Sequence, residues 1–322
     1  MTQSLSPSNE ALPPSTPVNW GRVGRYYAIA FGGAVIVTAV IAAVSALGGS
    51  TGAVVGQIVT AVLYMPLPLI ASIIVERRAG RRLLLAREWT HLRTAFWRTI
   101  GPSMGFALLV IVLILAFGAA VAALASVVGI PGAGHLVSGQ PEFEQHLSQL
   151  VPGAAGTALP PLAVIIVSTV ISGIVAGFTI NAVFAFGEEY GWRGVLADEL
   201  RGLGVLRANL IIGVLWGLWH APIIVVMGHN YPTQRGWGVL MMIAWTVPLS
   251  FLLWWVRDRA GSVLAPAFLH GAFNGTIGLF ALLIVGGAEL IALPMGILLA
   301  ITLAILAIAL WQFCPPRQRR QA

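Results

Sequence analysis

Five polar residues interrupt three otherwise apolar stretches of this sequence, and their types suit acid–base chemistry. Glu188 and Glu189 end one stretch, His220 lies within a second, and His270 and Asn274 lie four residues apart within a third. A carboxylate and a neutral imidazole can hold a water molecule between them and remove its proton. A second imidazole and an amide, one helical turn apart, can donate hydrogen bonds to the oxyanion that forms when hydroxide attacks a carbonyl. These residues predict a site that activates water.

Each group also has a purely structural explanation. Glu188 and Glu189 could emerge among lipid headgroups, with Glu189 in an i, i+4 ion pair with Arg193. His220 could be a packed neutral imidazole, and His270 could join two helices by hydrogen bonds. Together these explanations weaken, because ionisable side chains within membrane helices are costly and usually functional. The predicted catalytic residues are Glu188, His220, His270 and Asn274, and the predicted supporting residues are Glu189 and Arg193.

The composition indicates that a membrane is the solvent for the elements that carry these residues. The chain has 322 residues, of which 58% are hydrophobic and only 9% are charged, which is outside the range of soluble globular domains. Apolar stretches of about 20 residues, long enough to cross a bilayer as helices, recur along the chain. This pattern predicts an all-α polytopic membrane bundle of about eight transmembrane helices, near residues 26–47, 53–75, 103–128, 161–187, 209–227, 238–256, 262–284 and 290–313.

The arginines predict the orientation of these spans. The chain contains no lysine, and with a cytoplasmic N-terminus every arginine except Arg235 falls on the inner side of the membrane, as the positive-inside rule requires. Both termini are then cytoplasmic, in what we expect to be a bacterial plasma membrane. Counting residues from the inner surface, we expect the polar groups to meet in a water-filled recess that is open to the cytoplasm.

Local composition and net charge indicate the domain bounds and the kinds of partner. Residues 1–20, rich in Ser, Pro and Thr, predict a disordered tail. A single transmembrane domain is expected over 21–314, with its motif-bearing core at about 160–285, followed by a basic cytoplasmic tail at 315–322. The net charge of +7 lies in loops between spans and not on a soluble basic face, so we expect a lipid bilayer and no nucleic acid as partner. The sequence sets no oligomeric state.

Zinc is the alternative to a site without metal. Glu188, His220 and His270 could bind it, but the HExxH spacing is missing, and a single cysteine, Cys314, excludes a multi-cysteine site. We favour no cofactor and leave zinc open.

Three short motifs resemble those of the CPBP family, also called Abi, of CAAX-processing and bacteriocin-processing intramembrane endopeptidases. EEYGWR at 188–193 is similar to EExxxR, WGLWH at 216–220 to FxxxH, and HGAFN at 270–274 to HxxxN. One departure is Trp216, which stands where the family pattern has Phe. The resemblance implies a bundle in which Glu188 and His220 activate water, while the remaining predicted residues form and support the oxyanion site. It also implies peptide or protein substrates that are membrane-associated, lipidated or bacteriocin-like.

Two other functions would use the same residues. Intramembrane Glu and His also build proton relays in transporters, although the sequence has no evident inverted repeat. A non-catalytic immunity or scaffold protein would keep the cluster as structure. The sequence therefore predicts a peptidase, with these two functions as alternatives.

Overall fold

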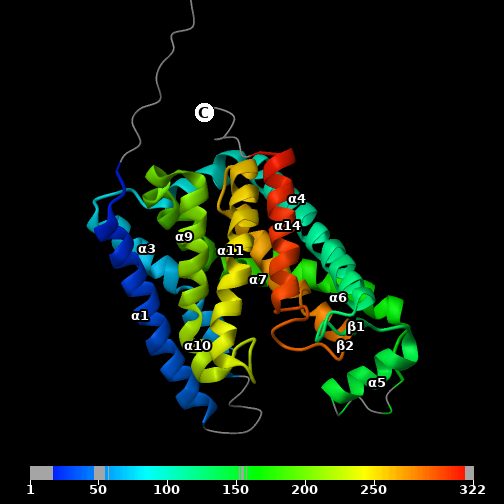
Figure 1. Cartoon of the computed structure of the whole chain (residues 1–322). Helices are drawn as coiled ribbons and strands as arrows, with labels where there is room; N and C mark the ends of the chain where they lie inside the picture. Colours follow the sequence, from blue (N-terminus) through cyan, green and yellow to red (C-terminus); the bar gives the residue numbers. More distant parts are fainter. Residues whose placement is uncertain are drawn as a thin grey trace, which may run out of the picture.

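The computed structural model describes residues 17–46, 55–56, 58–151, 153, 156 and 158–315, which form a bundle of helices (Figure 1). Its elements are α1 (Trp20–Ser45), the π-helix η1 (Thr60–Tyr64), α3 (Leu67–Arg78), α4 (Leu84–Val128), β1 (His135–Leu136), α5 (Gln140–Leu150), α6 (Leu162–Phe178), α7 (Ile180–Glu189), the π-helix η3 (Tyr190–Leu196), α8 (Ala197–Glu199), the 3₁₀ turn η4 (Arg201–Leu203), α9 (Gly204–Trp219), α10 (Ala221–Met227), α11 (Arg235–Ala260), α12 (Leu264–Thr276), α13 (Leu279–Leu283), β2 (Ile284–Val285) and α14 (Ile297–Phe313). The strands β1 and β2 pair antiparallel.

The described helices fit an integral membrane protein. Six of them are long and apolar enough to cross a membrane, and a seventh span results if the bent pair α6 and α7 is counted as one. All-α architecture is therefore confirmed. The last predicted span, 290–313, is helical only from Ile297 and forms a shorter apolar helix, α14. Nearly all of the predicted tails, 1–20 and 315–322, lies outside the described residues.

Two of the predicted spans are broken near residues that carry the candidate chemistry. The span 161–187 bends by 53° between α6 and α7, at Thr179, whose backbone is not helical. The span 209–227 is divided into α9 and α10 at His220. Pro222 explains the second break, because it has no N–H to continue the helical hydrogen bonds. Each break places a candidate group at the end of a short helix and not in the middle of a long one.

Helix α12 is the centre of the bundle. It is buried from Ala265 to Phe273 and packs against α4, α6, α7 and α11. Glycines allow this close packing, because a Cβ atom on Gly271 would collide with the carbonyl oxygen of Gly177 in α6. The backbone of α12 is therefore held directly against its neighbours, which fixes the height of the side chains that α12 carries.

Charged side chains gather at one end of the bundle. The described chain begins in α1 and ends in α14 at this end, whereas α5 and the β1–β2 pair lie at the other end (Figure 1). Asp198 and Glu199 form ion pairs here with arginines from four segments of the chain. We call this end the arginine-rich face, defined by Arg22, Arg81, Arg87, Arg201 and Arg257. Which side of a membrane it occupies stays a prediction.

Candidate active site

Two adjacent glutamates stand at the junction of α7 and η3 and turn in different directions. Both are buried, Glu189 completely. The helix continues from Tyr190 as a π-helix, a form that is rare and frequent at functional sites. Its wider turn keeps the chain helical while it changes which side chains face the interior. Glu188 lines a cavity, whereas Glu189 points to charged partners behind it.

Glu189 holds an arginine and a histidine through one oxygen. Its Oε1 atom accepts a hydrogen bond from Nη1 of Arg193 at 3.0 Å and lies 2.8 Å from Nδ1 of His270. A carboxylate can only accept in this contact, so Nδ1 of His270 carries the proton. The contact joins α7 to α12 and leaves Nε2 of His270 free for other partners. The predicted ion pair between Glu189 and Arg193 is present, and both side chains are fully buried.

Trp216 contacts both Glu188 and His220. Its indole Nε1–H donates to Oε2 of Glu188 at 2.9 Å, and its backbone carbonyl lies 2.9 Å from Nδ1 of His220. Because a carbonyl oxygen only accepts, Nδ1 of His220 is the donor, and the free electron pair of a neutral ring is on Nε2. The guanidinium carbon of Arg193 lies 4.2 Å from the centre of the Trp216 ring, a cation–π contact.

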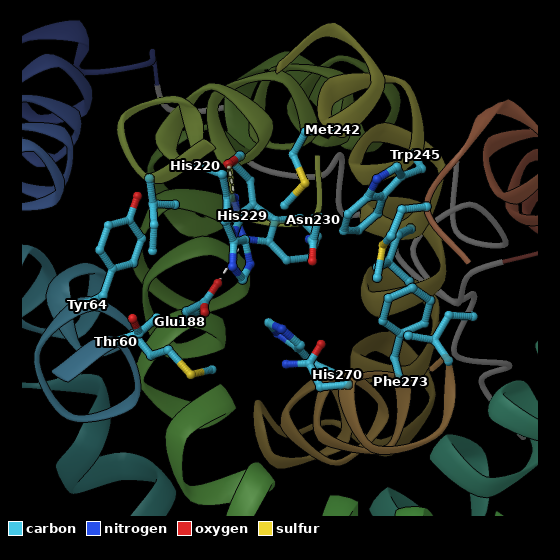
Figure 2. A pocket seen from close by; sticks show the side chains of 17 residues that line it. Thr60, Tyr64, Glu188, His220, His229, Asn230, Met242, Trp245, His270 and Phe273 are labelled. Atoms are coloured by element: carbon cyan, nitrogen blue, oxygen red, sulfur yellow. Dashed lines mark hydrogen bonds between the residues drawn. The ribbon is translucent and has the colours of Figure 1, made fainter. Parts of the chain in front are cut away.

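One cavity of about 260 Å³ connects these groups. Glu188, His220 and His270 surround it, from three different helices or helix ends (Figure 2). Asn274 also lines it and is exposed. The four predicted catalytic side chains therefore share one cavity. The two predicted supporting residues are not among the side chains that line it.

Among the cavity-lining residues that sequence reasoning missed, three carry polar groups that bear on the chemistry: Trp216, His229 and Asn230. Trp216 stands where the related motif has Phe, and its indole N–H bonds directly to Glu188. His229 and Asn230, in the loop between α10 and α11, also line the cavity. The histidine was a signal in itself, because it follows His220 by nine residues and lies next to an apolar helix. Nothing in the local sequence shows that this loop turns inward.

The side chains around the cavity are also of the types that bind metals. Both histidines have Nδ1 bound by an acceptor, an arrangement that also orients metal ligands in other proteins. Within the described part of the chain, however, no three His, Cys, Asp or Glu side chains are grouped so that they could hold a metal ion. Zinc bound by Glu188, His220 and His270 therefore does not fit this geometry.

Comparison with known proteins identifies the segment that carries this cavity. Residues 162–276 match the family model of the Rce1-like proteins, described as type II CAAX prenyl endopeptidase Rce1-like. This segment is similar to the Rce1-like family. This confirms the resemblance to the CPBP family, and all three motifs lie within the matched Rce1-like residues.

A named relative supports the same assignment over a shorter stretch. The chain is 31% identical over 87 residues to CAAX prenyl protease 2 from Methanococcus maripaludis. The match covers 25% of this chain and 32% of that protein, so the chain spans about a third of the length of the curated relative. Its Rce1-like core is thus shared, and the activity of the whole relative does not transfer by this match alone.

Proposed function

We propose that this protein is an intramembrane endopeptidase that hydrolyses peptide bonds of membrane-associated substrates with a water molecule activated by Glu188 and His220. The observation that carries the proposal is the shared cavity. Four side chains from three separate motifs of an Rce1-like segment line one cavity. A bacterial plasma membrane, as expected from the sequence, is its proposed location.

The reaction begins with the water. Nε2 of His220 accepts a hydrogen bond from it, and the carboxylate of Glu188 takes its proton as the oxygen attacks the carbonyl carbon of the peptide. The carbonyl π electrons move to oxygen and form a tetrahedral intermediate. The C–N bond then breaks, and Glu188 returns the proton to the leaving amine. Every proton and electron pair is therefore accounted for by the substrate, the water and Glu188.

The oxyanion is stabilised from α12. Asn274 donates through its amide N–H groups, and His270 donates through Nε2–H when its ring is doubly protonated. In that state two carboxylates, Glu188 and Glu189, face two cations, Arg193 and His270, so the cluster carries no net charge. A buried cluster without net charge avoids the large cost of an uncompensated buried ion.

Peptide cleavage by the purified protein tests the proposal. Quenched fluorescent peptides that end in Cys-aliphatic-aliphatic-X, with and without a farnesyl group, follow from the similarity to a CAAX prenyl protease and separate prenylated from unprenylated substrates. We expect cleavage by the unmodified protein and its loss in Glu188→Gln, which keeps the size of the side chain. Glu144→Gln, at an exposed position of α5, is the matched control and should cleave normally.

Treatment with a chelator tests whether the activity requires zinc. Activity should persist after treatment with 1,10-phenanthroline, since the proposed residues supply the base and the oxyanion donors. Loss of activity that added zinc restores would contradict this mechanism. Unchanged turnover in a folded Glu188→Gln variant would refute the proposed peptidase function. The proton-relay and scaffold functions would then be the remaining explanations of the polar cluster.

A further inference from the structure

Two buried glutamates that the proposed mechanism does not use lie close to the first turn of α4. Glu76 is near the end of α3, and Glu88 is in α4 itself. Carboxylates are rarely buried unless other groups bond to them, because removing them from water is costly. The partners of these two glutamates connect α4 to both of the helices that meet at the Glu189–His270 contact.

The first turn of α4 is capped by side chains from two other elements. The first N–H groups of a helix have no acceptor within that helix. Here the N–H of Leu84 donates to Oε1 of Glu76 at 2.8 Å, and the N–H of Leu85 donates to the hydroxyl of Tyr190 at 3.0 Å. That hydroxyl in turn donates to Oε2 of Glu76 at 2.7 Å. Tyr190 directly follows Glu189, so this cap joins the start of α4 to the start of η3.

The same turn of α4 also holds the start of α12. The hydroxyl of Ser262 donates to Oε2 of Glu88 at 2.6 Å, and its oxygen accepts from the N–H of Leu264 at 3.1 Å. Leu264 is the first residue of α12. Ser262 is therefore bound by α4 while it caps α12. Because His270 and Asn274 follow on the same helix, their positions depend on where this cap holds it.

A small apolar cluster fills the space between the two caps. Its buried members come from α4, from η3 and from the residue before α12: Leu84, Tyr190, Val195 and Val263. A Cβ atom on Gly194 would lie 2.5 Å from the side chain of Leu84, so the glycine allows this close approach. In a packed interior a displacement of one member must displace its neighbours. Movement of the first turn of α4 would therefore be transmitted to η3 and α12.

We propose that the first turn of α4, residues 84–88, is a bridge that sets the position of η3 relative to α12. Four side chains are the positioning residues of this bridge: Glu76, Glu88, Tyr190 and Ser262. None of the four is among the side chains that line the cavity, so they act on turnover only through the helices that they hold. The effect on turnover rests on the proposed function, whereas the link between the helices rests only on these contacts.

Amide hydrogen exchange of the full chain in lipid nanodiscs tests this link without any substrate. Tyr190→Phe keeps the ring and removes the hydroxyl that bonds to Glu76 and to the start of α4. We expect exchange in the segment 84–88 to become about three- to tenfold faster, as for the loss of one hydrogen bond. Exchange in η3 and in the first turns of α12 should also rise, because the bridge no longer holds them. Tyr27→Phe in α1, outside the cavity lining, is the control and should change none of the three.

Two exchange patterns would overturn the proposal. Faster exchange in 84–88 alone would show that the cap stabilises only its own helix. Unchanged exchange in all three segments would show that the Tyr190 hydroxyl holds none of them. If Tyr190→Phe does not fold, Glu88→Leu provides the same test from the side of α12. Since no cleavage is measured, these results are independent of whether Glu188 is catalytic.

Kinetics of a conservative pair at Glu88 test the effect on the site. Glu88→Gln keeps an oxygen that accepts from Ser262, whereas Glu88→Leu has no acceptor. We expect Glu88→Gln to keep kcat within about twofold and Glu88→Leu to lower it about tenfold with little change in KM, because small displacements of catalytic groups are costly. Ser103→Ala removes a buried hydroxyl that bonds to the carbonyl of Thr99 elsewhere in α4, and this control should keep kcat.

An unchanged kcat in Glu88→Leu would refute the positioning role. Equal losses in Glu88→Gln and Glu88→Leu would refute it as well, because the effect would then follow the charge and not the hydrogen bond to Ser262. If the unmodified protein cleaves no peptide, the proposed function fails, and the exchange experiment still decides whether the bridge holds η3 and α12.

Discussion

Nδ1 of His270 lies 2.8 Å from Oε1 of Glu189, the same oxygen that accepts from Arg193. This single atom joins α12 to the junction of α7 and η3, two segments separated by 81 residues. The contact fixes the tautomer and the direction of the imidazole, so that Nε2 is directed elsewhere. We therefore propose that Glu189 is a positioning residue, which acts on the site through His270 and not by contact with a substrate.

A double substitution separates the structural part of Glu189 from its effect on His270. Glu189→Gln leaves the buried Arg193 without its charge partner and should destabilise the protein by about 3–5 kcal/mol. Adding Arg193→Met removes the unpaired charge, so most of the stability should return. Activity should stay low, because His270 has still lost its carboxylate acceptor. Thermal unfolding and kcat, measured for both single variants and the double variant, test this.

If the double variant regains both stability and full kcat, Glu189 has only a structural role. If Glu189→Gln alone unfolds no more readily than the unmodified protein, the burial of this ion pair has been misjudged. A third variant, Arg201→Gln, breaks an exposed pair with Asp198 and serves as control. It should change stability by less than about 1 kcal/mol.

Trp216→Phe tests the hydrogen bond between the indole and Glu188. Phenylalanine keeps most of the ring packing and is the residue of the related motif, but it has no N–H. We expect kcat to fall about tenfold or more, since hydrogen bonds to charged groups contribute roughly 1.5–3 kcal/mol, with little change in KM. The physical reason is a carboxylate that is no longer held in one orientation toward the water.

Trp255→Phe is the matched control for that experiment. Its indole is also buried and donates to the carbonyl of Cys314 at 2.8 Å, and Trp255 does not line the cavity. Both variants should lower the melting temperature by similar amounts. Equal losses of kcat in the two variants would show that Trp216 acts through general packing and not through its hydrogen bond.

Asn274→Ala tests the proposed oxyanion donor. Removal of one such donor typically lowers kcat by about 10²–10³. KM should change little, because the interaction forms only as charge develops on the carbonyl oxygen. Asn209→Ala is a suitable control, since Asn209 is buried but bonds to the carbonyl of Val205 in its own helix. A rise in KM with unchanged kcat would make Asn274 a binding residue.

The sequence predicted the identity of the cavity groups better than their surroundings. Hydropathy locates helices because it averages over about 20 residues, but this average also hides the bend at Thr179 and the break at His220. Pro222 was a visible signal for the second break, whereas no residue type marks the first. The hydrogen bond from Trp216 depends on the rotation of α9 relative to α7, which only the packed structure defines.

The depth of the candidate residues in the bundle was hardest to predict for a related reason. Counting residues from the inner surface assumes straight helices that start at that surface. Helix α7 leaves α6 at 53°, so the position of Glu188 along the chain does not give its depth. His229 and Asn230 also lie in a loop, where neither hydropathy nor helical periodicity carries information about which way a side chain points.

Gly275→Ala tests how tightly the site depends on the packing of α12. A Cβ atom at this position would collide with the carbonyl of Gly173 in α6, so α12 must shift away from α6. We expect a loss of about 1–3 kcal/mol in stability, the typical cost of overpacking. Asn274 and His270 lie on the same helix and would shift with it. We therefore expect kcat to fall more than KM rises. Gly278→Ala, three residues further on, meets no atom within 4 Å and should be neutral. Equal effects of the two substitutions would show that flexibility of the chain, and not the contact between α6 and α12, sets the geometry of the site.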